Sequence, residues 1–181
     1  MIYMFCADGV EEVEALATLD VIRRAGLEIT TVGLNGNTAS GPHGIGFFTD
    51  MTLKEFEAAE RKADAVILPG GGAGTEALYN CKTVCDFVKK TASEGGYICA
   101  ICAAPSVLGR LGLLEGKRAT CYPGFEKYLY GAKATGEKTV TDGNAITAKG
   151  MGCAVDFGLA VVSALKGEAE AERIAKSIMF I

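Results

Sequence analysis

Histidine is almost absent from this sequence, which contains one, His43, in a segment rich in glycine, asparagine and proline. A structural zinc site usually needs four cysteine or histidine ligands. The pair Cys99-x-x-Cys102 has no second pair of this kind, so four ligands are hard to assemble. A protease with a Cys-His-Asp triad is also poorly supported, because His43 lies far upstream of these cysteines. We therefore expect no metal and no cofactor.

Long apolar runs and clusters of basic residues are also missing. No run approaches the ~20 residues of a membrane-spanning helix, and residues 1–6 are too short and carry no basic group for a signal peptide. The net charge of −4 argues against a nucleic-acid partner. Of the seven cysteines, an odd number, four lie in apolar runs: Cys6, Cys99, Cys121 and Cys153. We expect reduced thiols in a cytoplasmic protein that binds neither membrane nor nucleic acid.

Apolar runs and helical patterns alternate along the chain. Strands are predicted at 2–7, 28–32, 65–68, 97–101 and 118–121, with a hairpin at 139–147. Helices are predicted at 11–25, 82–94, 107–114, 156–165 and 168–178, and a short one after the capping box of Thr52 and Glu55. Residues 33–46 read as a loop, with a short hairpin near 45–47. The pattern predicts one α/β domain over residues 1–181, with a mostly parallel sheet covered by helices on both faces.

The segment from Tyr97 to Pro105 carries the strongest functional signal. Ala100 and Ala104 flank Cys102 at minus two and plus two, the spacing of a nucleophile elbow, where only small neighbours fit a sharp strand-to-helix turn. Pro105 suits the first turn of the next helix. Free cysteines at strand ends are often inert core residues. The helix N-terminus favours a thiolate at Cys102 instead, and so predicts a lowered thiol pKa.

Glu14 is the candidate partner of Cys102. Val10, Val13, Ala17 and Val21 form an apolar stripe on the predicted helix, and Glu14 shares it because it lies four residues after Val10 and three before Ala17. Burial would raise its pKa and let it donate a proton to a thiolate. The alternative is a side chain that reaches water. Its neighbours Glu11 and Glu12 read as acids of the first helical turn that face solvent.

Residues 70–74, Gly-Gly-Gly-Ala-Gly, follow a predicted strand. A dinucleotide fingerprint would need glycine at Thr75, no clear helical period follows, and no Lys-Ser/Thr pair marks a phosphate loop. The glycines are better explained as bare N–H donors that form an oxyanion hole near Cys102. The strand ends at Asp8-Gly9, at 69–72 and at Cys102 are expected to converge on one crevice.

Several motifs together resemble the DJ-1/PfpI (ThiJ/PfpI) superfamily, above all the Parkinson-associated DJ-1 branch and its bacterial relatives. The resemblance implies a flavodoxin-like three-layer sandwich that forms a homodimer, with Cys102 as the oxidation-sensitive nucleophile and a protonated Glu14 bonded to its sulfur. The motifs run in order over nearly the whole chain: Asp8-Gly-Val-Glu-Glu-Val-Glu14, Asp20-Val-Ile-Arg-Arg-Ala-Gly26, Leu68-Pro-Gly-Gly71, Ala100-Ile-Cys102-Ala-Ala-Pro105 and Thr147-Ala-Lys-Gly-Met-Gly152.

The resemblance also assigns supporting residues, with two departures. It implies that the N–H groups of Gly71 and Ala103 form the oxyanion hole, and that Arg24 and His43 approach the partner subunit's site. Many relatives have arginine where this chain has His43. Catalytic members often have histidine at the position of Tyr122, and none follows Cys102 here, so the proton shuttle of the glyoxalase-type members is incomplete.

Two functions follow as hypotheses. In the first, Cys102 adds to a reactive dicarbonyl or to a glycated thiol or amine, as in a glyoxalase or deglycase, and Glu14 or Tyr122 moves the proton. In the second, the protein is a redox sensor or protective chaperone without turnover, switched by oxidation of Cys102.

Overall fold

The computed structural model describes residues 1–181, and its core is a seven-stranded sheet. Neighbouring strands are parallel except for the antiparallel pair β10–β11. The order 2-1-3-4-5 of the five central parallel strands is that of flavodoxin-like folds. Across the sheet the strands are β10 (Thr139–Asp142), β11 (Ala145–Ala148), β7 (Tyr97–Ile101), β6 (Ala65–Leu68), β1 (Ile2–Cys6), β2 (Ile29–Gly33) and β5 (Met51–Thr52).

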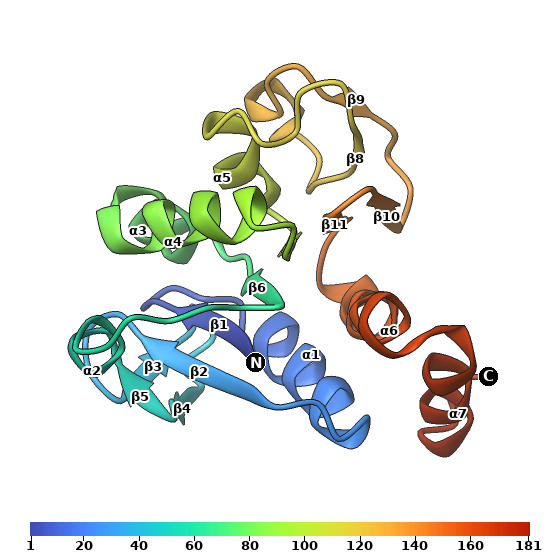
Figure 1. The fold of residues 1–181 in the computed structure, drawn as a ribbon, viewed down its shortest axis with the longest axis horizontal. Coiled ribbons are helices and arrows are strands. Elements are labelled where there is room, and N and C mark those ends of the chain that lie inside the picture. Colours follow the sequence, from blue (N-terminus) through green and yellow to red (C-terminus); the bar gives the residue numbers. More distant parts are fainter.

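Helices cover both faces of the sheet, as predicted. One side carries α1 (Glu12–Arg24), α6 (Ala154–Lys166) and α7 (Glu168–Ser177), and the other carries α2 (Leu53–Glu57), α3 (Gly72–Asn80), α4 (Lys82–Ser93) and α5 (Pro105–Arg110) (Figure 1). Side chains along each strand alternate between the two cores: Met4 packs on the α1 side, Phe5 on the α4 side. The flavodoxin-like three-layer sandwich is confirmed. No helix in it is long and apolar enough to cross a membrane.

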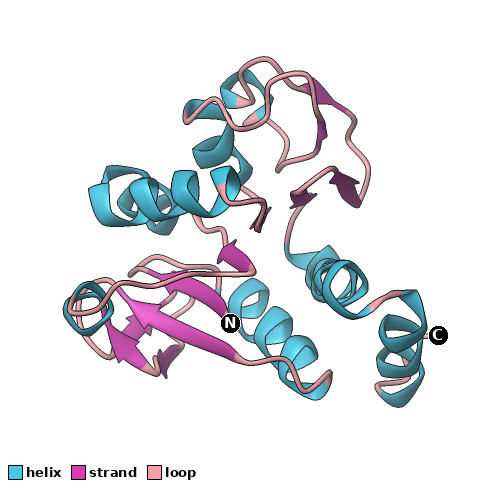
Figure 2. Cartoon of the chain, viewed as in Figure 1, coloured by secondary structure: helices cyan, strands magenta, loops and turns pink.

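Smaller elements fill the connections. A hairpin of β3 (Thr38–Ser40) and β4 (Gly46–Phe48) forms within and just beyond the predicted loop. A second small sheet pairs β8 (Arg118–Ala119) with β9 (Lys133–Ala134), and two short 3-10 helices are η1 (Glu126–Tyr128) and η2 (Met151–Cys153). The stretch between α5 and β10 is mostly loop (Figure 2).

Three sequence-based expectations about these elements were wrong. The sequence analysis expected no helix after the glycine run, but helix α3 begins at Gly72, within that run. Helix α5 begins directly at Pro105 and is only six residues long. The strand predicted at 118–121 shrinks to two residues outside the main sheet. Val13 also leaves the predicted buried stripe of α1, with 44% of its surface exposed.

Candidate active site

Cys102 stands at a strained turn between β7 and α5. Its φ of 65° lies in the left-handed region, which side chains other than glycine rarely adopt. Ala100 and Ala104 on either side are fully buried, so a larger side chain at either place would have no room. The turn is held at both ends, because the Cys102 N–H donates to Ala148 O at 2.9 Å and its carbonyl accepts from Tyr122 N at 2.7 Å. The local geometry is that of a nucleophile elbow.

Glu14 lies against this elbow from α1. Its side chain is fully buried, and Oε2 accepts a hydrogen bond from the Gly70 N–H at 3.0 Å. The other oxygen, Oε1, is buried without a hydrogen-bond partner. Glu14 and Cys102 are neighbours across Gly70, where a Cβ would lie within 2.6 Å of both Glu14 Oε2 and Cys102 Cβ, and each group shifts the pKa of the other. The prediction that Glu14 is buried beside Cys102 is therefore confirmed.

The glycine run brings bare backbone to the same sulfur. The N–H groups of Gly71 and Ala103 act on Cys102 Sγ as hydrogen-bond donors and lower the thiol pKa. Gly70 has to be glycine, because a Cβ there would lie 2.5 Å from Glu14 Oε2 and 2.6 Å from Cys102 Cβ. The sequence analysis placed Gly70 in the glycine run that supplies N–H donors, but it did not foresee that the Gly70 N–H donates to Glu14.

The three strand ends that the sequence predicts to converge do meet in the structure. Glu11 N donates to Gly70 O at 3.0 Å, which ties the turn after β1 to the glycine run. A Cβ on Gly71 would lie only 2.1 Å from Gly9 O, so these two loops are in direct contact. Asp8-Gly9, the glycine run and the elbow therefore meet at the carboxyl edge of the sheet.

Glu14 and Cys102 titrate as a coupled pair. Burial is the main cause that raises the pKa of Glu14 to about 7, and burial together with the neighbouring carboxylate raises the pKa of Cys102 to about 12. Together the two groups thus lose one proton near neutral pH, and they keep the second proton until the pH is much higher. With these pKa values the remaining proton lies mainly on the sulfur, and its transfer to Glu14 would give a thiolate that faces three donors: Glu14 and the N–H groups of Gly71 and Ala103.

The prediction of a lowered Cys102 pKa is therefore wrong for a thiol beside an ionised carboxylate. It considered the helix N-terminus, whose N–H groups do lower the pKa, but not the burial of the sulfur. Desolvation and the charge of Glu14 outweigh the two backbone donors.

Tyr122 lies next to the elbow through its backbone bond to Cys102 O. Its side chain is half exposed. With Pro123 and residues 149–153 it lines a mostly apolar cavity of about 440 Å³. Tyr122 thus stands at the sequence position where the resemblance expects a histidine, and its ring lines a cavity that Cys102 does not line.

His43 and Arg24 are not brought to Cys102 within the chain. His43 is exposed and bonded to Glu12, and Arg24 is exposed and paired with Asp20 at 2.5 Å. Their predicted role concerns a partner subunit and stays a prediction.

The interpretation of Glu12 as a solvent-facing acid is wrong. Its side chain is 2% exposed and accepts two hydrogen bonds from His43. Glu11 caps α1 through its bond from Glu14 N at 2.7 Å. Glu11, Glu12 and His43 place potential metal ligands within 4.8 Å of one another, but these groups already satisfy each other or the helix end.

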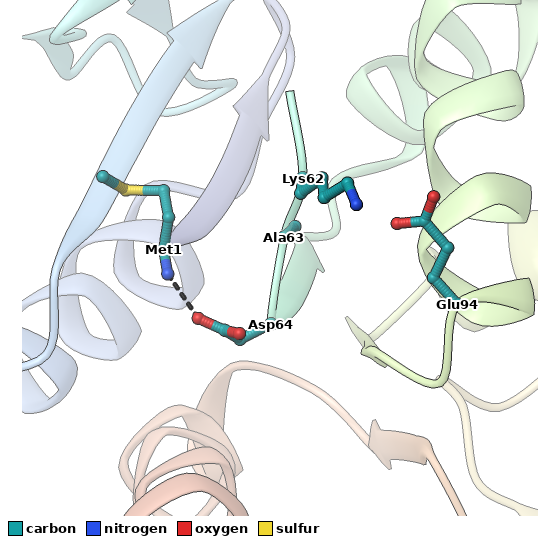
Figure 3. A pocket seen from close by; sticks show the side chains of 5 residues that line it. All are labelled: Met1, Lys62, Ala63, Asp64 and Glu94. Carbon is teal, nitrogen blue, oxygen red and sulfur yellow. Dashed lines mark hydrogen bonds and ion pairs between the residues drawn. The ribbon is translucent and has the colours of Figure 1, made fainter. Parts of the chain in front are cut away.

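The largest cavity, of about 570 Å³, lies away from this chemistry. It forms around the start of β1 and β6, at the amino edge of the sheet, where the Met1 amine bonds to Asp64 and Lys62 faces Glu94 (Figure 3). No thiol or hydroxyl nucleophile lines it. The carboxyl edge with Cys102 is thus the better candidate site.

The other cysteines differ from Cys102 in their surroundings. All seven are free, and Cys6, Cys99 and Cys121 are buried, which raises the pKa of each thiol. Backbone N–H donors do not lower the pKa of any of these three. Cys102 alone combines partial exposure with a positive φ and a carboxyl neighbour.

Comparison with known proteins identifies the family. The profile of the DJ-1/PfpI family matches residues 1–164. The chain is 38% identical to Drosophila melanogaster Protein dj-1beta over 176 residues, 96% of this chain and 93% of the relative. It is 31% identical to the Caenorhabditis elegans protein named Glutathione-independent glyoxalase DJR-1.2 over 173 residues, 94% and 91% of the two chains. The crystal structure of Drosophila DJ-1beta superposes with a TM-score of 0.90 at 35% identity, covering 98% and 96% of the two chains. The chain therefore belongs to the DJ-1/PfpI family.

Proposed function

We propose that this protein is a cysteine-dependent enzyme that converts small 2-oxoaldehydes, such as methylglyoxal, into 2-hydroxy acids. The observation that carries the proposal is the Cys102 thiol, held between a buried Glu14 and the N–H groups of Gly71 and Ala103. The name of the C. elegans relative, a glutathione-independent glyoxalase, supports it. The overall reaction adds one water, and it oxidises the aldehyde carbon while reducing its neighbour. It needs no external oxidant or reductant.

The steps use groups already in place. The Cys102 thiolate adds to the aldehyde carbon, and the carbonyl electron pair moves to oxygen, where the two backbone N–H groups stabilise the charge. Protonation of that oxygen gives a hemithioacetal. A base then takes the proton from the former aldehyde carbon, and a proton is delivered to the adjacent carbon through an enediol, leaving a thioester. Water hydrolyses the thioester, which releases the 2-hydroxy acid and restores the thiol.

Glu14 is the proposed proton carrier. Its pKa of about 7 suits a group that both accepts and donates a proton near neutral pH. Tyr122, half exposed beside the elbow, is the alternative carrier.

The test is release of 2-hydroxy acid from methylglyoxal. Wild type is expected to turn over, and Cys102→Ser to lose activity by about 100-fold or more, because the nucleophile is removed. Cys81→Ser, which changes a half-buried thiol at the start of α4, is the matched control and should keep full activity. A wild type that releases no acid, or an active Cys102→Ser variant, contradicts the proposal.

A second candidate is a redox sensor without turnover. The observation that favours it is Tyr122 at the position where catalytic members often have histidine. The same three donors around Cys102 suit an oxidised sulfur that carries negative charge, and one of the similar solved structures is that of oxidized Toxoplasma gondii DJ-1. Mild peroxide adding two oxygens at Cys102 first, in a protein that does not turn over methylglyoxal, would favour this function.

We also propose a twofold homodimer built on α1 and the β3–β4 hairpin. Val13 and Leu16 on α1 are 44% and 37% exposed, and Ile45 and Phe48 on the hairpin are 52% and 81% exposed. The bonds between Glu12 and His43 fasten the hairpin loop to the start of α1, and so join the two elements that carry these exposed apolar side chains. In a dimer formed there, His43 would be carried toward the partner subunit.

The cytoplasm stays the proposed compartment. All seven cysteines are free thiols, and two of them, Cys6 and Cys99, lie fully buried within strands. A chain with this many unpaired thiols suits a reducing environment.

A further inference from the structure

The side chain of Arg110, at the end of α5, is fixed in three directions. It is 12% exposed, and its Nη2 lies 2.7 Å from Glu76 Oε1 on α3. The guanidinium lies over two rings, 4.7 Å from the centre of Tyr79 and 4.3 Å from that of Tyr128. An arginine that is stacked on two rings and paired with a carboxylate has little freedom left.

The three segments that Arg110 joins all lead back to Cys102. Helix α3 begins directly after Gly71, and α5 begins two residues after Ala103. Segment 122–128 starts at Tyr122, whose N–H donates to Cys102 O. The ends of these three segments that lie next to Cys102 surround its sulfur, and Arg110 connects the same three segments farther from the sulfur.

No other polar contact links α3 to α5. The hydroxyls of Thr75 on α3 and Ser106 on α5 are both buried and have no partner. Helix α5 packs closely against segment 122–128, since a Cβ on Gly109 would lie 2.2 Å from Tyr128 O. The relative position of the two helices thus depends on apolar packing and on the Arg110 side chain.

We propose that Arg110 is a positioning residue of the active site, which holds α3, α5 and segment 122–128 so that the N–H groups of Gly71 and Ala103 stay directed at Cys102. It touches neither the sulfur nor the substrate. Small displacements of donors from a reacting atom have large effects on rate, so a distant clamp of this kind can control the chemistry. For turnover the inference rests on the proposed function, but the reactivity of the thiol tests it independently.

The experiment compares the pH profile of Cys102 alkylation by iodoacetamide, mapped by mass spectrometry, in wild type and in Arg110→Met. Without the contacts of Arg110 with Glu76, Tyr79 and Tyr128, here called the clamp, the N–H groups of Gly71 and Ala103 should stabilise the thiolate less. The midpoint of the alkylation profile should therefore move to higher pH by roughly half a unit or more. Arg110→Lys keeps the charge but not the planar contacts, and should show a smaller shift in the same direction. Tyr128→Leu should also shift the profile, whereas Tyr128→Phe keeps the ring and should not. If wild type turns over methylglyoxal, kcat should fall in Arg110→Met with KM little changed.

The control is Val84→Ala on α4, a fully buried residue of the same core that lies outside the three segments that Arg110 joins. It should lower the Tm without moving the alkylation profile. An Arg110→Met variant that does the same, with a lower Tm and an unmoved profile, shows a purely structural role and overturns the proposal. If Arg110→Met does not fold, unmoved profiles in both Arg110→Lys and Tyr128→Leu overturn it. A wild type without turnover refutes the proposed enzyme but leaves the alkylation result decisive.

Discussion

The Glu12 carboxylate accepts two hydrogen bonds from His43: Oε1 lies 2.9 Å from the backbone nitrogen, and Oε2 lies 2.9 Å from the ring nitrogen Nδ1. The carboxylate is 2% exposed while the imidazole is 68% exposed. The hydrogen bond and the opposite charge lower the pKa of Glu12 to about 2 and raise the pKa of His43. The pair fastens the loop that carries His43 to the first turn of α1, two residues before Glu14.

We expect the contribution of His43 to stability to depend on pH. A histidine whose pKa is raised in the folded state stabilises most below its unfolded pKa of about 6.5, and this effect is lost as pH rises through the folded pKa. His43→Gln keeps a neutral donor but removes the charge. The Tm of this variant should therefore lie below that of wild type at pH 5.5, with the gap closing by pH 9. A gap of the same size at both pH values would show that the charge plays no part.

For Glu14 we expect the opposite arrangement, a cost to stability that grows with pH. Its pKa is raised from 4.5 to about 7, so the folded state binds more protons than the unfolded state between these values, and stability falls as pH rises through them. The full shift corresponds to about 3 kcal/mol. Urea unfolding should find Glu14→Gln more stable than wild type at pH 8 but not at pH 4.

The matched control for this experiment is Glu28→Gln, which changes an exposed carboxylate outside the site. It should leave the pH dependence of unfolding as in wild type. If Glu14→Gln is no more stable at pH 8 than at pH 4 relative to wild type, Glu14 does not carry the raised pKa.

Gly70 and Gly72 offer a matched pair for the geometry of the site. Gly70→Ala would press a methyl group against Glu14 Oε2, Cys102 Cβ and Ile101 O, all within 3 Å. We expect it to lower stability by about 1–3 kcal/mol and to reduce the alkylation rate of Cys102. Gly72→Ala meets nothing within 4 Å at the start of α3, and should be neutral or stabilise by up to about 1 kcal/mol. Equal behaviour of the two variants, measured by urea unfolding and alkylation, would mean that Gly70 does not shape the site.

Much of the site could be predicted because its signals are local. The alanines around Cys102 state directly that the turn is crowded, and the helical phase of Glu14 puts it on the buried face whatever the tertiary structure. Helix α3 was missed because its first residues, Gly-Ala-Gly, have poor helix propensity, and its start is set by the turn at Gly71 rather than by a side-chain cap.

The rest depends on contacts between distant segments. Glu12 is buried because the loop around Gly41 closes over it, where a Cβ would lie 2.0 Å from its Cδ. Nothing in the helical pattern of α1 announces that loop. The pKa of Cys102 was mispredicted for the same reason, because the burial of its sulfur and the carboxylate of Glu14 arrive through the fold and not from the neighbouring sequence.

The proposed homodimer predicts that a charge on the outer face of α1 will separate the subunits. Val13→Glu adds a carboxylate to a side chain that is already 44% exposed in the single chain, so it should leave the fold intact but place an unpaired charge within the interface. Light scattering at micromolar concentration should give a dimer for wild type and a monomer for Val13→Glu, with unchanged circular dichroism. Met179→Glu, at an 89% exposed residue beyond α7, is the control and should stay dimeric. A monomeric wild type, or a dimeric Val13→Glu variant, would exclude α1 as the contact and leave Cys102 to work with Glu14 and the backbone donors of its own chain.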